Sequence, residues 1–247
     1  MNTLKSTLLT LALAGIATAS HAAAVRVVFD DPIFTGSGYD AVHIKFPNAG
    51  GSKTEYVAAG RFQGTASNLV GVSPGIFVDS VDDMFMYCYD LYESIGNGSV
   101  VDYNINFDGA FSRTLDFLGA VNSVMNTGSM YDPYAWLRPV NHNQGAAIQL
   151  GIWESKYEID ADWSLTTGSF RAWSLEGATT TYWNDFVQAI PNSNALEQRF
   201  TMVLEARGAQ DMIAGDPPVN VPEPGSLALL GLALAGLAAT RRKPKAA

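Results

Sequence analysis

Two apolar segments, one near each end of the chain, constrain the fold most, because they leave only the residues between them to build a core. The first segment begins with a basic residue, Lys5, continues with an apolar stretch from Leu8 to Ala17 and ends in Ser20-His21-Ala22. A basic start, a short apolar centre and small residues at the end form the pattern of a cleaved secretory signal peptide. Residues 1–22 are therefore predicted to direct export and to be removed.

The second apolar segment runs from Leu227 to Ala239, and three basic residues follow it: Arg241, Arg242 and Lys243. It is shorter than the roughly 20 residues of a typical spanning helix, although flanking residues and long basic side chains can extend its reach. Basic clusters stay on the cytoplasmic side of a membrane, so the residues before this segment are predicted to lie outside. We expect the segment to insert into the membrane.

The tripeptide Pro222-Glu223-Pro224 stands shortly before the second apolar segment. In this order of parts, residues 221–247 resemble the PEP-CTERM sorting signal of Gram-negative bacteria. The resemblance implies that a membrane-embedded exosortase recognises and removes the tail. The mature protein would then go to the cell surface or the extracellular matrix. An ordinary C-terminal membrane anchor is the alternative.

The residues between the two segments are predicted to form one exported domain at 23–208, followed by a linker at 209–220. The whole chain has a formal net charge of −9 at pH 7, and several of its basic residues lie in the terminal segments. The exported part is therefore more acidic still, which argues against binding to DNA or RNA. Sparse charges with frequent glycine and aromatic residues favour a β-rich domain.

Residue periodicity predicts an α+β fold with many strands and about three helices on or beside the sheet. Strands are expected at residues 25–29, 39–46, 55–62, 76–79, 84–92, 101–107 and 200–206. Helices are expected at residues 112–126, 144–158 and 180–190, and a loop at 64–75. The strand at 84–92 is apolar on both faces, which favours a central position with 101–107 as its partner.

Two short motifs contain the residues that are most suited to chemistry. Cys88 is the only cysteine of the chain and lies in Tyr87-Cys88-Tyr89-Asp90 of the expected central strand. A lone thiol outside the cell must be buried, paired between chains, or used. Gln149 lies in the second expected helix among apolar residues, where its carboxamide needs hydrogen-bond partners.

Together these motifs resemble the Cys–Gln thioester domain of surface adhesins in Gram-positive bacteria. There an aromatic-Cys-aromatic strand is linked to an apolar-Gln-x-x-x-Trp helix. The resemblance implies a thioester between Cys88 and Gln149, close to Trp153, and covalent attachment to a surface or exopolysaccharide target. His142 is a candidate base because it precedes Gln149 on the same helix. Asp90 is less suitable, since its negative charge raises the pKa of a thiol.

Two positions depart from that family's pattern: Gly151 replaces a bulkier apolar residue, and Ile148 stands where adhesins often have Thr. One alternative is a non-covalent structural or carbohydrate-binding matrix protein, and another is a secreted hydrolase with an unrecognised site. No familiar catalytic motif is present, so we expect a protein that is not an enzyme. We also expect no cofactor and no metal site, because His43 and His142 are far apart and the acidic clusters lack EF-hand spacing.

Overall fold

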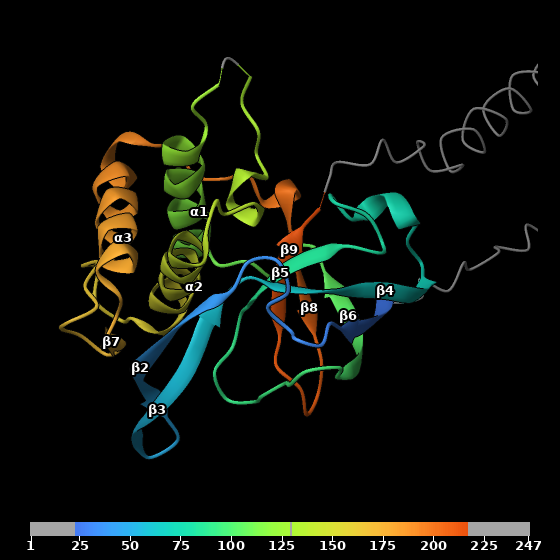
Figure 1. Cartoon of the computed structure of the whole chain (residues 1–247), viewed down its shortest axis with the longest axis horizontal. Coiled ribbons are helices and arrows are strands. Elements are labelled where there is room, and N and C mark those ends of the chain that lie inside the picture. The colour runs from blue at the N-terminus through green and yellow to red at the C-terminus, as the bar shows by residue number, and fades with distance from the viewer. Residues whose placement is uncertain (1–22, 129, 217–247) are drawn as a thin grey trace, which may run out of the picture.

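The computed structural model describes residues 23–128 and 130–216. A closed β-barrel and a separate three-stranded sheet combine with three α-helices, and Figure 1 shows the helices gathered on one side of the barrel. The predicted α+β class is therefore confirmed. The predicted signal peptide, the Pro222-Glu223-Pro224 motif and the basic cluster lie outside the described residues.

Six antiparallel strands close the barrel, because β1 pairs with β4 on one side and with β6 on the other. In order of pairing, the strands are β1 (Ala24–Phe29), β4 (Phe62–Val70), β5 (Met84–Cys88), β9 (Met212–Gly215), β8 (Thr201–Glu205) and β6 (Val100–Asn106). Along β1, Val25, Val27 and Phe29 are buried while Val28 is exposed. This alternation fills the barrel with side chains, and closure leaves no unpaired edge.

The second sheet has the order β3-β2-β7, formed by β3 (Gly51–Gly60), β2 (Tyr39–Asn48) and β7 (Arg171–Trp173). On β2, Val42, Ile44 and Phe46 point inward and are fully buried. In Figure 1 the β2–β3 hairpin extends away from the barrel below the helices. The period-2 pattern that predicted β2 from the sequence therefore reflects one face packed on the core.

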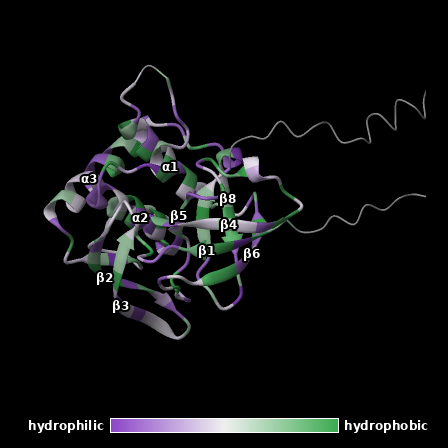
Figure 2. Cartoon of the chain, turned by 45° about the vertical axis from the view of Figure 1, so that its right-hand side comes forward, coloured by the Kyte–Doolittle hydropathy of each residue, from purple (hydrophilic) through white to green (hydrophobic). Residues whose placement is uncertain are grey.

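Helix α2 (His142–Tyr157) lies at the centre of the helical part, where it contacts α1 (Ser112–Met125), α3 (Gly177–Ala189) and strands β2, β3 and β5. It is buried along nearly its whole length, as its apolar sequence predicts. Figure 2 shows hydrophobic segments on the barrel strands and on these helices. Among the described residues, no helix has the length and hydropathy needed to cross a membrane.

Several local predictions are wrong. Most of the loop predicted at 64–75 is strand β4, where small residues hid an alternating pattern. No strand forms at the predicted residues 76–79, and Ile76 is instead the last residue of a 3-10 turn, Pro74–Ile76. The strand predicted at 84–92 ends at Cys88, because the Asp90 carboxylate accepts hydrogen bonds from the backbone N–H groups of Tyr92 and Glu93 and turns the chain.

Two predictions about longer connections also need correction. The strand β6, predicted to pair with β5, pairs instead with β1 and β8. The linker predicted at 209–220 contains β9, which pairs with both β5 and β8 and completes the barrel. Four apolar or small residues carry no pattern that separates a short buried strand from a linker. The cap of α2 is Asn141, whose side chain accepts a hydrogen bond from Gln144 N.

Candidate functional site

Cys88 at the end of β5 and Gln149 in the middle of α2 are in direct contact. The Gln149 Oε1 atom accepts a hydrogen bond from Cys88 N at 2.9 Å, and the Gln149 Nε2 atom donates one to Cys88 O at 2.8 Å. Both residues are fully buried. The fold thus brings the two predicted residues together, although they are 61 positions apart in the sequence.

The sulfur of Cys88 has two hydrogen-bond partners. It donates to Asp90 O at 2.6 Å and accepts from Trp153 Nε1 at 3.4 Å. Trp153 and Gln149 are four positions apart on α2, so they share one face of the helix. Burial raises the pKa of the Cys88 thiol well above its usual range, and the Trp153 N–H only partly opposes this effect. Cys88 is therefore a neutral thiol near pH 7.

Lys156 is a residue of this site that the sequence prediction missed. It lies three positions after Trp153 and seven after Gln149, which places it on the same face of α2. Its Nζ atom lies 4.0 Å from the ring centre of Tyr89, the residue after Cys88. Burial lowers the pKa of Lys156, and its positive charge lowers the pKa of Cys88. Helical spacing from Gln149 was the signal that could have identified it.

His142, the predicted base, lies in the first turn of α2. Its Nε2 atom is 3.2 Å from Glu176 Oε2, and the side chain is partly exposed. Seven residues of helix separate it from Gln149 by about 10 Å along the helix axis. Within the described residues no hydrogen bond joins His142 to Cys88 or Gln149. Lys156 also has no hydrogen bond to these two residues in the described part of the chain, but its charge acts on the pKa of Cys88, which makes it the better placed of the two basic side chains.

Packing explains why residue 151 is a glycine, although the thioester-domain pattern has a bulkier apolar residue there. The ring of Phe117 from α1 lies directly on Gly151, and a Cβ atom there would overlap that ring. Any larger residue would push α1 away from α2. Ile148, the other departure, is fully buried and contributes to the core. Neither departure disturbs the contact between Cys88 and Gln149.

Glu154, the residue after Trp153, is fully buried. Its Oε1 atom accepts a hydrogen bond from Ser164 N at 3.0 Å and lies 3.8 Å from the Arg113 guanidinium. Its Oε2 atom has no hydrogen-bond partner among the described residues. Burial raises the pKa of Glu154 to about 8, so this carboxyl is largely protonated at pH 7.

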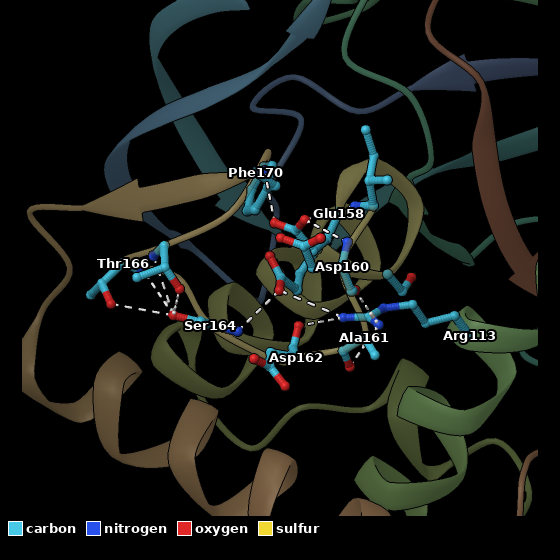
Figure 3. A network of polar contacts seen from close by, with 12 residues as sticks. Arg113, Glu158, Asp160, Ala161, Asp162, Ser164, Thr166 and Phe170 are labelled. Atoms are coloured by element: carbon cyan, nitrogen blue, oxygen red, sulfur yellow. Dashed lines mark hydrogen bonds and ion pairs between the residues drawn. The ribbon is translucent and has the colours of Figure 1, made fainter.

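The loop at residues 158–170 is held by two charged side chains (Figure 3). The Glu158 carboxylate accepts hydrogen bonds from the backbone N–H groups of Ile159, Asp160 and Phe170. From α1, the Arg113 guanidinium donates to three successive backbone carbonyls, those of Asp160, Ala161 and Asp162. The loop is therefore fixed to the first turn of α1 and to the residue that follows α2.

A cavity of about 230 Å³ reaches the surroundings of Cys88. Its lining includes Trp153, which contacts the sulfur, and Gln210, whose Nε2 atom donates to Asp90 O at 3.1 Å. Two acidic residues, Glu55 and Glu93, also line it. Within the part of the chain that the structure describes, no three His, Cys, Asp or Glu side chains gather as a metal site.

Comparison with known protein families gives a match for the C-terminal residues. Residues 220–243 match the family model described as the PEP-CTERM protein-sorting motif. No curated protein matches the chain, and no solved structure matches it. The predicted sorting motif, including Pro222-Glu223-Pro224 and the basic cluster, is thereby confirmed in sequence. The chain carries the motif that implies recognition by an exosortase, export and sorting to the cell surface.

Proposed function

We propose that this exported chain forms an internal thioester between Cys88 and Gln149 and uses it to attach itself covalently to a surface or matrix target. The observation that carries the proposal is the pair of hydrogen bonds that hold the Gln149 carboxamide against the Cys88 backbone. The bond would join the last residue of a barrel strand to the central helix. Each molecule would react once, so the protein is not an enzyme in this proposal.

Thioester formation is an acyl substitution on the Gln149 side chain. The Cys88 sulfur attacks the carboxamide carbon, the bond from that carbon to Nε2 breaks, and the thiol proton leaves with the nitrogen as ammonia. The Cys88 N–H already donates to Gln149 Oε1 at 2.9 Å, so it can stabilise the negative charge that develops on this oxygen. The product is an activated acyl group stored in the core.

The thiol must lose its proton during the attack, and Lys156 is the group that we assign to take it and to pass it on to the leaving Nε2 atom. Burial lowers the pKa of Lys156, which increases the fraction of neutral amine available as a base. The Trp153 N–H at 3.4 Å from the sulfur favours the developing thiolate. The full burial of Tyr87 and Tyr89 on either side of Cys88 keeps water away from the finished bond.

We assign the approach of the attacking group to the cavity beside Trp153, because Trp153 both lines it and contacts the Cys88 sulfur. The two acidic residues of this cavity favour the approach of a cationic amine and can accept its proton, which a nucleophilic amine must lose. Glu55 also pairs with Lys53, whereas Glu93 accepts a hydrogen bond from Gly208 N. Attack of the amine on the Gln149 carbon forms an amide and returns the Cys88 thiol. A primary amine on a protein or polyamine is therefore the preferred target.

The same contacts favour a second candidate function, that of a non-covalent structural or matrix protein. Both polar atoms of the Gln149 carboxamide are already paired with the Cys88 backbone, so an intact glutamine satisfies every buried group there. In that case Gln149 only ties β5 to α2. The two candidates differ in the covalent mass of the protein.

The test is the intact mass of the purified protein, followed by treatment with methylamine. A thioester lowers the mass by about 17 Da through loss of ammonia, and methylamine then adds about 31 Da and releases a thiol. Because Cys88 is the only cysteine, any titrated thiol belongs to it. Cys88→Ala and Gln149→Ala should each show the mass of their sequence. After refolding, Lys156→Met should lose ammonia more slowly than His142→Ala.

A full mass in the folded wild-type protein, with a thiol that titrates only after unfolding, would reject the thioester and leave the structural role. Equal rates of ammonia loss in Lys156→Met and in the wild type would reject Lys156 as the base. A slow His142→Ala variant would restore His142 to that role. Circular dichroism of each variant shows whether it is folded before its mass is interpreted.

A further inference from the structure

A second cavity, of about 510 Å³, opens between β7, α3 and the loop at residues 158–170. It shares no lining residue with the cavity beside Trp153. Three tryptophans from three separate segments line it: Trp163, Trp173 and Trp183. Its volume lies within the range of about 300–1,000 Å³ that is typical of small-ligand sites.

The three indole rings are held in place by neighbours outside the cavity. Phe117 stacks with Trp163 at a centroid distance of 5.6 Å and with Trp183 at 6.1 Å. Trp173 stacks with His43 of β2 at 5.5 Å, with the ring planes only 11° apart. Trp163 also contacts the Arg113 guanidinium, and Trp183 is buried. Trp173, which is 42% exposed, is therefore the ring that offers a free surface to a ligand. It is fixed before any ligand binds, which reduces the entropy lost on binding.

Apart from the tryptophans, the lining consists of three apolar residues and five residues that are polar but uncharged. The polar residues are Ser164, Thr166, Ser174, Thr180 and Asn184. The Ser164 hydroxyl is occupied by the turn shown in Figure 3, where it accepts from Thr166 N and Thr167 N. In contrast, no hydrogen bond joins the Asn184 carboxamide or the Ser174 hydroxyl to another described residue. These groups are available to a ligand.

The backbone of Ser174, which lines the cavity, has an unusual conformation. Its φ angle is +65°, a left-handed conformation that costs free energy in a residue other than glycine. This turn directs the chain from β7 into α3. On α3, Thr180, Trp183 and Asn184 follow at spacings of three and four, so they share the helix face toward the cavity. Aromatic and hydrogen-bonding groups therefore converge on one space.

We propose that this cavity binds one or two pyranose rings of an uncharged glycan. A pyranose presents apolar C–H groups on its faces, which pack on indole rings, and hydroxyl groups at its edge, which pair with carboxamides and hydroxyls. A quaternary ammonium ligand fits less well, because no carboxylate of the described residues lines the cavity and Trp163 already contacts the Arg113 guanidinium at 4.0 Å. A purely apolar ligand would strip water from the polar lining without replacing its hydrogen bonds.

The glycan site does not depend on the thioester, because the two cavities have separate linings. It would hold the exported protein on a surface polysaccharide reversibly. If Cys88 and Gln149 also react, the glycan site would keep the protein near its covalent target and raise the effective concentration of that target. The two properties can therefore be tested one without the other.

The experiment titrates the purified protein with cellohexaose, mannohexaose and xylohexaose and follows tryptophan fluorescence and heat of binding. At least one of these oligosaccharides should bind reversibly and shift the tryptophan emission. Trp173→Ala and Asn184→Ala should each weaken that binding by roughly tenfold, the effect of losing one stacking or polar contact. Tyr131→Ala, which removes an exposed aromatic ring outside the cavity, should leave it unchanged.

Three results would overturn the proposal. One is the failure of all three oligosaccharides to bind the folded wild-type protein. Another is binding that Trp173→Ala and Asn184→Ala do not weaken although both variants unfold at the wild-type temperature. The last is binding of choline with a Trp173-dependent signal in place of the sugars, which would identify the cavity as a cation site.

Discussion

Glu154 shows how one buried carboxyl makes the stability of this domain depend on pH. Its side chain is fully buried, with one oxygen bonded to Ser164 N and the other without a partner among the described residues. Burial raises the pKa of Glu154 to about 8, whereas an unfolded chain would hold it near 4.3. The folded state therefore binds this proton more tightly than the unfolded state does.

The difference between the folded and unfolded pKa values of Glu154 determines how the free energy of unfolding changes with pH. Glu154 favours the folded state fully below about pH 4, and this contribution is lost as pH rises toward 8. Glu154→Gln keeps the shape but removes the charge, so its free energy of unfolding should match the wild type near pH 4. Near pH 8.5 it should exceed the wild type by about 1–3 kcal/mol. Urea unfolding at both pH values measures this difference.

Glu197→Gln is the matched control, because it removes a carboxylate that lies at the surface beside Arg199. Its free energy of unfolding should stay within about 0.5 kcal/mol of the wild type at both pH values. If Glu154→Gln were as pH-dependent as the wild type over this range, Glu154 would not be the group responsible.

At the scale of elements, helix α2 decides how the domain is assembled. It contacts both other helices and three strands, and it carries Gln149, Trp153 and Lys156 on one face. Gly151 allows α1 to approach, since the Phe117 ring occupies the place of a side chain. Phe117 in turn supports Trp163 and Trp183 of the proposed glycan cavity. One glycine therefore links helix packing to the second candidate site.

Gly151→Ala should destabilise the domain by about 2–3 kcal/mol, because the new methyl group overlaps a buried ring that has no space to move into. Gly145→Ala on the same helix is the matched control. A methyl group there would lie 3.4 Å from Pro139 Cγ, an ordinary contact, so helix propensity should leave its stability equal or up to about 1 kcal/mol higher. Thermal unfolding compares the two variants, and equal losses in both would refute the packing argument.

At the scale of the whole molecule, the barrel is completed by a strand from the end of the described chain. Strand β9 lies between β5 and β8, and its Met212 is opposite Cys88. Met212, Ile213 and Ala214 are buried. The position of Cys88 is therefore stabilised by residues more than a hundred positions later in the chain.

Ending the chain at residue 208 should abolish cooperative unfolding, because it exposes the edges of β5 and β8 and removes the buried side chains of β9. The matched control ends at residue 220 and keeps β9. It should unfold in a single transition at the wild-type temperature. Circular dichroism on heating distinguishes the two, and similar curves would show that β9 is dispensable.

The sequence alone determined what depends on short-range patterns. The apolar segments at the two ends indicated export and sorting, and the sorting motif is matched at residues 220–243. Helical and alternating periodicity indicated the α+β class and most elements, because these patterns record which face of an element is buried. Cys88 and Gln149 could be selected because an unpaired thiol and a buried carboxamide both require an explanation.

Only the tertiary structure decided what depends on contacts between distant segments. Strand β6 pairs with β1 and β8, and β9 enters the barrel, because closure of a barrel is a property of all its strands together. Glu154 became notable only when its burial was known, and the burial that lowers the pKa of Lys156 is likewise a property of the folded chain. The cavity of three tryptophans joins a loop, a strand and a helix. No local sequence pattern can predict such a site, because its residues come together only after the chain has folded.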